Sequence, residues 1–134
     1  MRAIVGVLLL LATPAAAQTV TLKGTAGQTA TLNARDIAAL PHTGFTFDAH
    51  GQKHDYEGPL LIDVLAKVGV AAGKPVGGKD LADVVLVAAS DGYRIAIGLA
   101  EADPNTRPNR ISVADRADGA LLSEKDGPFK LVIE

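Results

Sequence analysis

The apolar residues of this 134-residue chain come in short runs, and glycine, proline and polar turn residues separate these runs. Alternation of apolar and polar residues at 19–23, 43–48 and 93–98 predicts half-buried strands. One segment differs: between Gly58 and Gly69, leucines and valines recur at helical spacing, with Pro59 suited to the first helical position and Gly69 to a left-handed C-cap. No strand–helix–strand rhythm is present. The pattern therefore predicts an α+β fold, a mixed β-sheet domain of many short strands with two short helices.

Two further segments complete this prediction. The other helix is expected directly after Asn33, which is suited to be its N-cap. Asp36, three residues later, is the reciprocal partner of a capping box. The run VVLVA at 84–88 is continuously apolar. Continuous runs of this length are typical of strands buried on both faces, so we expect such a strand here.

Composition excludes several classes of protein. The chain has thirteen Lys and Arg residues and fifteen Asp and Glu residues, mixed along its length. This distribution gives no basic surface of the kind that binds nucleic acid. The chain has no cysteine, which excludes disulfides, thiolate metal sites and a thiol nucleophile. Since 48 % of the residues are apolar and only 4 % aromatic, we expect one packed core of Val, Leu, Ile and Ala.

The N-terminal segment has the features of an export signal. Met1-Arg2 precedes an apolar run at 3–12, Thr13-Pro14 ends that run, and Ala15–Ala17 provide the small residues that signal peptidase accepts. The run is too short to span a bilayer as a stable helix. We therefore interpret 1–17 as a signal peptide and 18–134 as a single domain, periplasmic or secreted and free of the membrane after cleavage. The alternative is an uncleaved membrane anchor.

This interpretation predicts where the exported protein begins. Signal peptidase is expected to cleave after Ala17, so N-terminal sequencing of the exported form should start at or beside Gln18. A mature protein that still begins at Met1 would refute the prediction.

Three histidines lie close together in the sequence, and two of them flank an expected hairpin turn. His50 and His54 stand on either side of that turn, near enough in sequence for both rings to share a divalent metal with Asp48. Histidines beside a hairpin turn are also commonly exposed to solvent without a ligand. The sequence leaves both interpretations open.

A second pair of candidate residues lies in the loop at 104–110. Arg107 and Arg110 share this loop with two prolines and two asparagines, and paired guanidinium groups suit a phosphate or a carboxylate. Glu101 and Asp103 are equally placed to bind the arginines as surface ion pairs.

Three segments, in the same order along the chain, resemble elements of the oxidoreductase molybdopterin-binding domain, the sulfite oxidase-type fold. The first is YEGPLLIDVL (56–65), similar to an aromatic-x-Gly-x-x-Leu-x-Asp-Leu-Leu run. The second is the Asp-Gly-Tyr sequence at 91–93. The third combines Asp-Gly-x-x-Leu (118–122) with Gly-Pro-x-Lys-Leu-Val (127–132), where the family usually has arginine in place of Lys130.

The resemblance implies a fold, a cofactor class and a set of binding residues. Molybdopterin is the cofactor that it implies, and the hydrogen-bond donors expected for its phosphate are the side chains of Arg107, Arg110 and Lys130, together with the backbone N–H groups of Asp91 and Gly92. Enzymes of this fold hold molybdenum through a cysteine thiolate, which this chain lacks. The family also continues with a further strand-forming segment beyond the position of Glu134.

The expected function is therefore that of an exported, non-catalytic binding module for a small anionic ligand or a protein partner, with no catalytic residue assigned. Two alternatives stay open. One is a molybdopterin-dependent oxidoreductase component whose metal has no protein thiolate. The other is a periplasmic metal-binding protein that uses His50 and His54.

Overall fold

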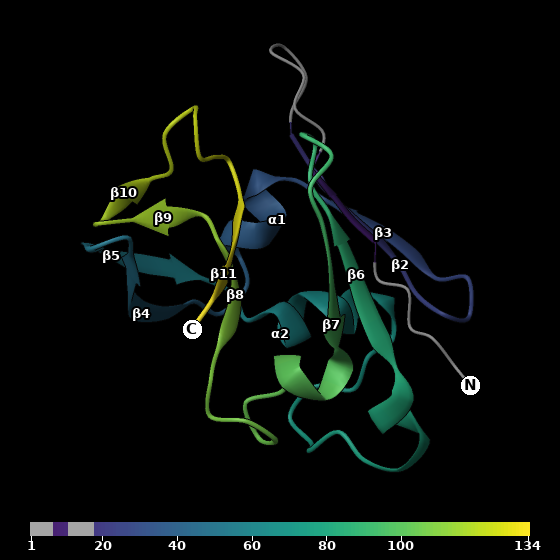
Figure 1. The fold of residues 1–134 in the computed structure, drawn as a ribbon. Helices are drawn as coiled ribbons and strands as arrows, with labels where there is room; N and C mark the ends of the chain where they lie inside the picture. Colours follow the sequence, from purple (N-terminus) through teal and green to yellow (C-terminus); the bar gives the residue numbers. More distant parts are fainter. Residues whose placement is uncertain (1–6, 11–17) are drawn as a thin grey trace.

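The strands of the protein form three sheets in the computed structural model, which describes residues 7–10 and 18–134 (Figure 1). The largest sheet has the order β3-β2-β1-β6-β7, and its strands are β1 Val7–Leu10, β2 Val20–Lys23, β3 Thr29–Leu32, β6 Val84–Ala88 and β7 Arg94–Gly98. A second sheet has the order β10-β9-β5-β4 and comprises β4 Thr43–Ala49, β5 Gln52–Gly58, β9 Arg116–Ala117 and β10 Ala120–Leu121. The third pairs β8 Ile111–Ala114 with β11 Lys130–Ile133.

Helices are short and few in the described part of the chain, which confirms the α+β class. They are α1 Ala34–Ala38, α2 Leu61–Leu65 and the 3-10 helices η1 Ala66–Val68, η2 Gly78–Ala82 and η3 Leu99–Ala102. The capping box expected at α1 is present: the Asn33 side chain accepts from the Asp36 N–H at 3.0 Å, and Asp36 accepts from the Asn33 N–H at 2.9 Å. The helix formed by α2 and η1 ends as expected at Gly69, whose φ is 90°.

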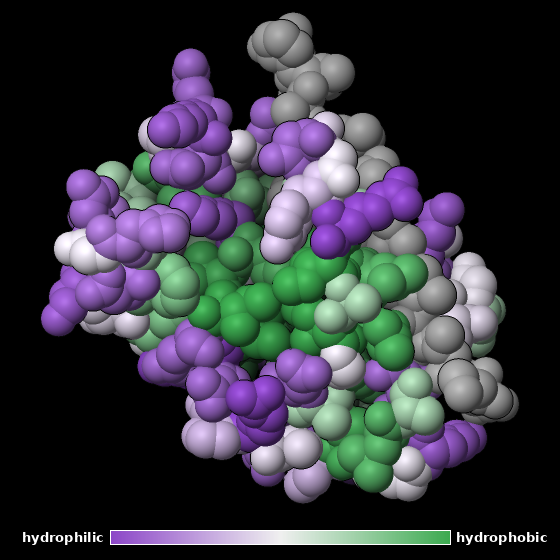
Figure 2. All heavy atoms as spheres, viewed as in Figure 1, coloured by the Kyte–Doolittle hydropathy of each residue, from purple (hydrophilic) through white to green (hydrophobic). Residues whose placement is uncertain are grey.

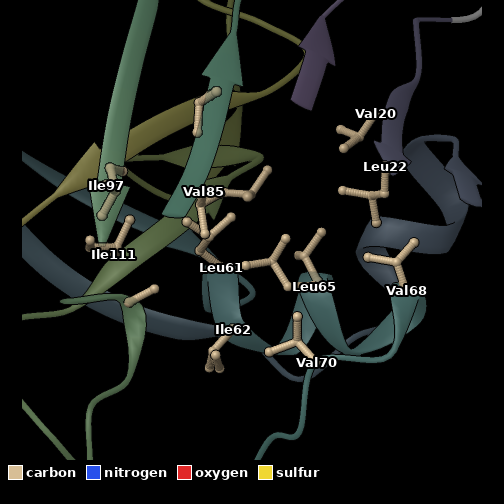
Figure 3. Close-up of a cluster of buried hydrophobic side chains, with 14 of the residues drawn as sticks. Val20, Leu22, Leu61, Ile62, Leu65, Val68, Val70, Val85, Ile97 and Ile111 are labelled. Atoms are coloured by element: carbon tan, nitrogen blue, oxygen red, sulfur yellow. The ribbon is translucent and has the colours of Figure 1, made fainter. Parts of the chain in front are cut away.

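The main core lies between this helix and the five-stranded sheet. Leu61, Leu65 and Val68 extend from α2 and η1 toward Val20 and Leu22 of β2 (Figure 3). All five side chains are at most 3 % exposed. The apolar stripe read from the sequence is therefore the buried face of the helix.

A second, smaller core joins the four-stranded sheet to the β8–β11 pair. It consists of Phe45, Tyr56, Ala114 and Val132. On the face seen in Figure 2, apolar residues form a band across the middle of the molecule, bordered by hydrophilic residues. The separate sheets are thus held together by apolar packing, in addition to their backbone hydrogen bonds.

The prediction that 84–88 is buried on both faces is wrong. Val85 and Val87 are 1 % and 5 % exposed, but Leu86 between them is 42 % exposed. Successive side chains of a strand point to opposite faces of its sheet. Since α2 packs on the inner face, the residues of β6 alternate between the core and the outer surface.

The predicted signal peptide coincides with part of the largest sheet. Val7–Leu10 forms β1, and the other residues of 1–17 lie outside the described part of the structure. Among the described residues, no helix has the length and apolar character needed to cross a membrane.

Candidate ligand pocket

A pocket of about 320 Å³ opens between α1, the β9–β10 hairpin and the segment before β11. Its polar residues are His42, Asp115 and Arg116. Its apolar wall is formed by Ala34, Ala38, Leu121, Leu122, Pro128 and Phe129. A few polar groups set in an apolar concave surface are typical of sites for small molecules.

His42 and Asp115 form an ion pair in this pocket. The Nε2 atom of His42 lies 3.0 Å from both carboxylate oxygens of Asp115, and its Nδ1 atom lies 2.7 Å from the carbonyl oxygen of Leu40. A neutral imidazole has one N–H donor, whereas both ring nitrogens here face acceptors. The protonated ring can donate to both acceptors, so this geometry favours the charged form of His42.

The pKa of His42 is raised above its ordinary value for the same reason. Burial lowers this pKa, but the hydrogen bonds to Asp115 and to the Leu40 carbonyl raise it, as do the negative charges of Asp115 and Glu57. The raising effects prevail. The side chain of His42 is only 22 % exposed, so its contact with Asp115 is partly shielded from solvent.

The backbone positions both members of the pair. Leu40-Pro41 ends the α1 segment and turns the chain, which brings His42 to the start of β4. Asp115 follows β8, where its N–H donates to the Glu57 carbonyl at 3.0 Å and its own carbonyl accepts from the Leu122 N–H at 3.1 Å. The two residues are 73 positions apart in the chain, so only the tertiary fold brings them together.

Arg116 provides a positive charge in the pocket lining. Its side chain is exposed at the start of β9, and no ion pair or hydrogen bond of this side chain exists among the described residues. With His42 protonated, the pocket lining holds two cations and one carboxylate. The Glu57 carboxylate, opposite Arg116 on β5, offsets part of this positive charge, so the exposed Arg116 guanidinium is the group that suits an anionic ligand.

The His42–Asp115 pair predicts a dependence of stability on pH. Because the pKa of His42 is higher in the folded than in the unfolded protein, its stabilising effect is complete below about pH 6.5 and is lost as the pH rises through the folded-state pKa. Urea denaturation at about pH 5.5 and about pH 8.5 should therefore show a larger difference between the wild type and His42→Gln at the lower pH. His50→Asn, in an exposed turn, is the control, and an equal loss at both pH values for His42→Gln would contradict the prediction.

The five residues expected from the sequence to bind an anion do not lie together in this pocket. Arg110 donates to both Glu134 oxygens at 2.6 Å, and this contact raises the pKa of Arg110 and lowers that of Glu134. Arg107 lies 3.6 Å from Glu101, both side chains being 52 % exposed. Both arginines are therefore in ion pairs, as in the alternative interpretation, but Glu134 is the second partner in place of Asp103. Asp103 is 1 % exposed and accepts hydrogen bonds from Val76, Asn105 and Thr106.

The other three expected donors lie elsewhere in the fold. Lys130 lies 3.8 Å from Asp126 and 3.4 Å from the Tyr56 hydroxyl. Asp91 and Gly92 form the β6–β7 turn, at the end of that hairpin opposite the loop that carries the arginines (Figure 1). There the Asp91 carboxylate accepts from the Tyr93 N–H at 2.9 Å.

The histidines of the β4–β5 hairpin form no metal centre among residues 7–10 and 18–134, where no group of three or more potential ligands occurs. His54 Nδ1 lies 2.7 Å from Asp118, on the neighbouring β9–β10 turn. The hydrogen bond from the Asp55 N–H and the contact with His54 together lower the pKa of Asp118. His50 occupies the turn itself with a φ of 55°, and Asp48 accepts from the Gly51 N–H.

The residues present do not fit a thiolate-held molybdenum cofactor. The chain contains no cysteine, and Arg107, Arg110 and Lys130 each have a carboxylate of this chain within 4.0 Å. In comparisons with known proteins, the chain matches no family model and no curated protein sequence.

Asp115 and Arg116 were not identified as pocket residues from the sequence. Their only local signal is an acid–base dipeptide directly after the apolar run at 111–114, which is common on protein surfaces. His42 is the third of the three clustered histidines, but sequence spacing does not indicate Asp115 as its partner. The pocket is a product of tertiary structure.

Proposed function

We propose that this chain is an exported, non-catalytic binding domain of the molybdopterin-binding-domain type, which holds a small anionic molecule in the pocket at His42, Asp115 and Arg116. The observation that carries the proposal is the exposed Arg116 guanidinium, which forms no ion pair or hydrogen bond with the described residues, beside the His42–Asp115 pair. The pair lines the pocket and forms without a ligand. Arg116 offers its guanidinium donors, which suit phosphate and carboxylate groups.

The apolar wall adds a second requirement on the ligand. Leu121 is 71 % exposed at the rim, while Phe129 is buried at 3 % behind it. A ligand with an apolar body covers part of this surface, and burial of apolar area contributes free energy of binding. The preferred class is therefore a small molecule that carries an anionic group on an apolar or aromatic body.

Binding of phenyl phosphate, measured by isothermal titration calorimetry, tests both requirements. Phenyl phosphate should bind more tightly than inorganic phosphate, which has no apolar body, and more tightly than benzyl alcohol, which has no charge. Arg116→Ala should weaken its binding about tenfold, and the affinity should fall as ionic strength rises because Arg116 is exposed.

Arg107→Ala is the matched control, since it removes an exposed arginine that is paired with Glu101 outside the pocket. Its affinity for phenyl phosphate should equal that of the wild type. Equal losses for Arg107→Ala and Arg116→Ala would contradict the assignment of the site. Stoichiometric molybdenum in protein purified from its native host, together with turnover of an oxidisable or reducible substrate, would instead support the oxidoreductase alternative.

A further inference from the structure

The strand β1 stands between two strands that do not pair with each other. It runs parallel to β6, with Val7 opposite Leu86 and Leu9 opposite Ala88. It runs antiparallel to β2, with Leu9 opposite Thr21. The sheet order β3-β2-β1-β6-β7 therefore depends on β1 to connect the β2–β3 hairpin to the β6–β7 hairpin.

Cleavage before Gln18, as the sequence predicts, would remove β1 from this position. The facing edges of β2 and β6 would then lose the backbone hydrogen-bond partners that β1 supplies. Unpaired strand edges are templates for another strand, and unpaired backbone groups at a buried position are costly. The mature protein would contain a strand-sized gap inside its largest sheet.

Direct pairing of β2 with β6 would close this gap only by moving the β2–β3 hairpin. Neighbouring strands lie about 4.8 Å apart, so the hairpin would have to move by about that distance. Val20 and Leu22 of β2 are 0 % exposed because they pack in the core with the α2–η1 helix. A movement of this size would break that packing, which favours a gap that persists.

We propose that the gap in the mature chain accepts an apolar β-strand from a partner protein, parallel to β6 and antiparallel to β2. The sequence VLLL of Val7–Leu10 defines the length, the direction and the apolar character of the strand that fits. A second mature copy is a poor donor, since it has lost the same run and its apolar segment β6 is already paired with β7. The proposal depends on the predicted cleavage and is independent of the ligand pocket.

The test uses mature protein purified from exporting cells, its N-terminus verified by mass spectrometry. The probe is a peptide of residues 6–11 (GVLLLL), flanked by lysines for solubility. It should bind saturably and raise the thermal unfolding midpoint. The same peptide with N-methyl leucine at position 9 keeps the side chain but loses a backbone donor, and it should bind about tenfold more weakly.

The register is tested by cross-linking, because the chain has no cysteine of its own. A peptide with cysteine in place of Leu9 should form a disulfide with Thr21→Cys in a glutathione redox buffer. It should react about tenfold less with Lys23→Cys, two residues further along the same face of β2, since disulfide geometry requires close Cβ atoms. The thermal shift of the unsubstituted protein keeps the test decisive if either variant folds poorly.

Saturable binding with preferential cross-linking at position 21 supports the proposal. Four results would overturn it: no binding of the peptide, equal cross-linking at positions 21 and 23, an exported protein that retains residues 1–17, or a mature protein that forms a stable dimer in which a second copy occupies the gap. Only the third of these results also removes the predicted export cleavage, and none of them bears on the ligand pocket.

Discussion

Gly58→Ala is expected to destabilise the protein by about 3 kcal/mol, because an added Cβ would make the closest contact found at any described glycine. A Cβ atom at this position would overlap the carbonyl oxygen of Val113 and lie 2.6 Å from the Cα of Ala114. Both obstacles are backbone of β8. They cannot rotate away as a flexible side chain would.

Hydrogen bonds on either side of Gly58 prevent the two segments from separating. The Val113 N–H donates to the Pro59 carbonyl at 2.9 Å, and the Asp115 N–H donates to the Glu57 carbonyl at 3.0 Å. Relief of the clash would require loss of one or both bonds. Because Asp115 belongs to the pocket, Gly58→Ala should also weaken the binding of phenyl phosphate.

The control for this substitution is Gly44→Ala, in the neighbouring strand of the same sheet. A Cβ at Gly44 would meet its nearest atom at 3.6 Å, an ordinary contact. Urea denaturation should give a change of less than about 1 kcal/mol for this control. Similar destabilisation by both substitutions would show that close approach of β8 is not the reason for glycine at position 58.

Leu65→Ala is expected to cost about 2–5 kcal/mol, through lost transfer free energy and the cavity left behind. The side chain is 1 % exposed and lies in the α2–η1 stripe that faces β2 (Figure 3). Its neighbours in the core come from both the helix and the sheet, so little collapse of the cavity is possible.

Lys67→Ala, on the exposed side of the same helix, should change the free energy of unfolding by less than about 0.5 kcal/mol. Urea melts of the two variants and the wild type measure the difference directly. Comparable losses for Leu65→Ala and Lys67→Ala would mean that the helix is not packed by the face described.

Local sequence signals predicted α1, the helix formed by α2 and η1, and the strands β2, β4, β6 and β7. The capping box at Asn33 and the left-handed Gly69 depend on residues close together in the chain, where local conformational preferences decide the structure. The apolar stripe of α2 depends on the helical period, which is also local. These features could be read without knowledge of the tertiary fold.

Local sequence patterns did not predict which strand faces are buried or which distant segments lie in contact. The run at 84–88 is apolar throughout, yet Leu86 is exposed, since the number of covered faces depends on where α2 packs. Gly58 was recognised as a helix-preceding glycine, but its contact with β8 comes from a strand more than fifty residues away. Non-local contacts carry no periodic signal.

The candidate site illustrates the same limit. Arg107 and Arg110 were singled out because two arginines share one loop, and the structure pairs them with Glu101 and Glu134. Glu134 is far from both arginines in the sequence, so its bidentate contact with Arg110 could not be foreseen. The pocket formed by His42, Asp115 and Arg116 depends on contacts between distant segments in the same way.

Nitrogen-edited NMR of the protein during titration with phenyl phosphate tests directly whether an anion binds in the pocket at Arg116. We expect saturable shifts of the Arg116 guanidinium signal and the His42 ring, with the guanidinium signals of Arg107 and Arg110 unchanged. Shifts confined to Arg107, Arg110 and Lys130, or the lack of any saturable shift, would contradict this expectation.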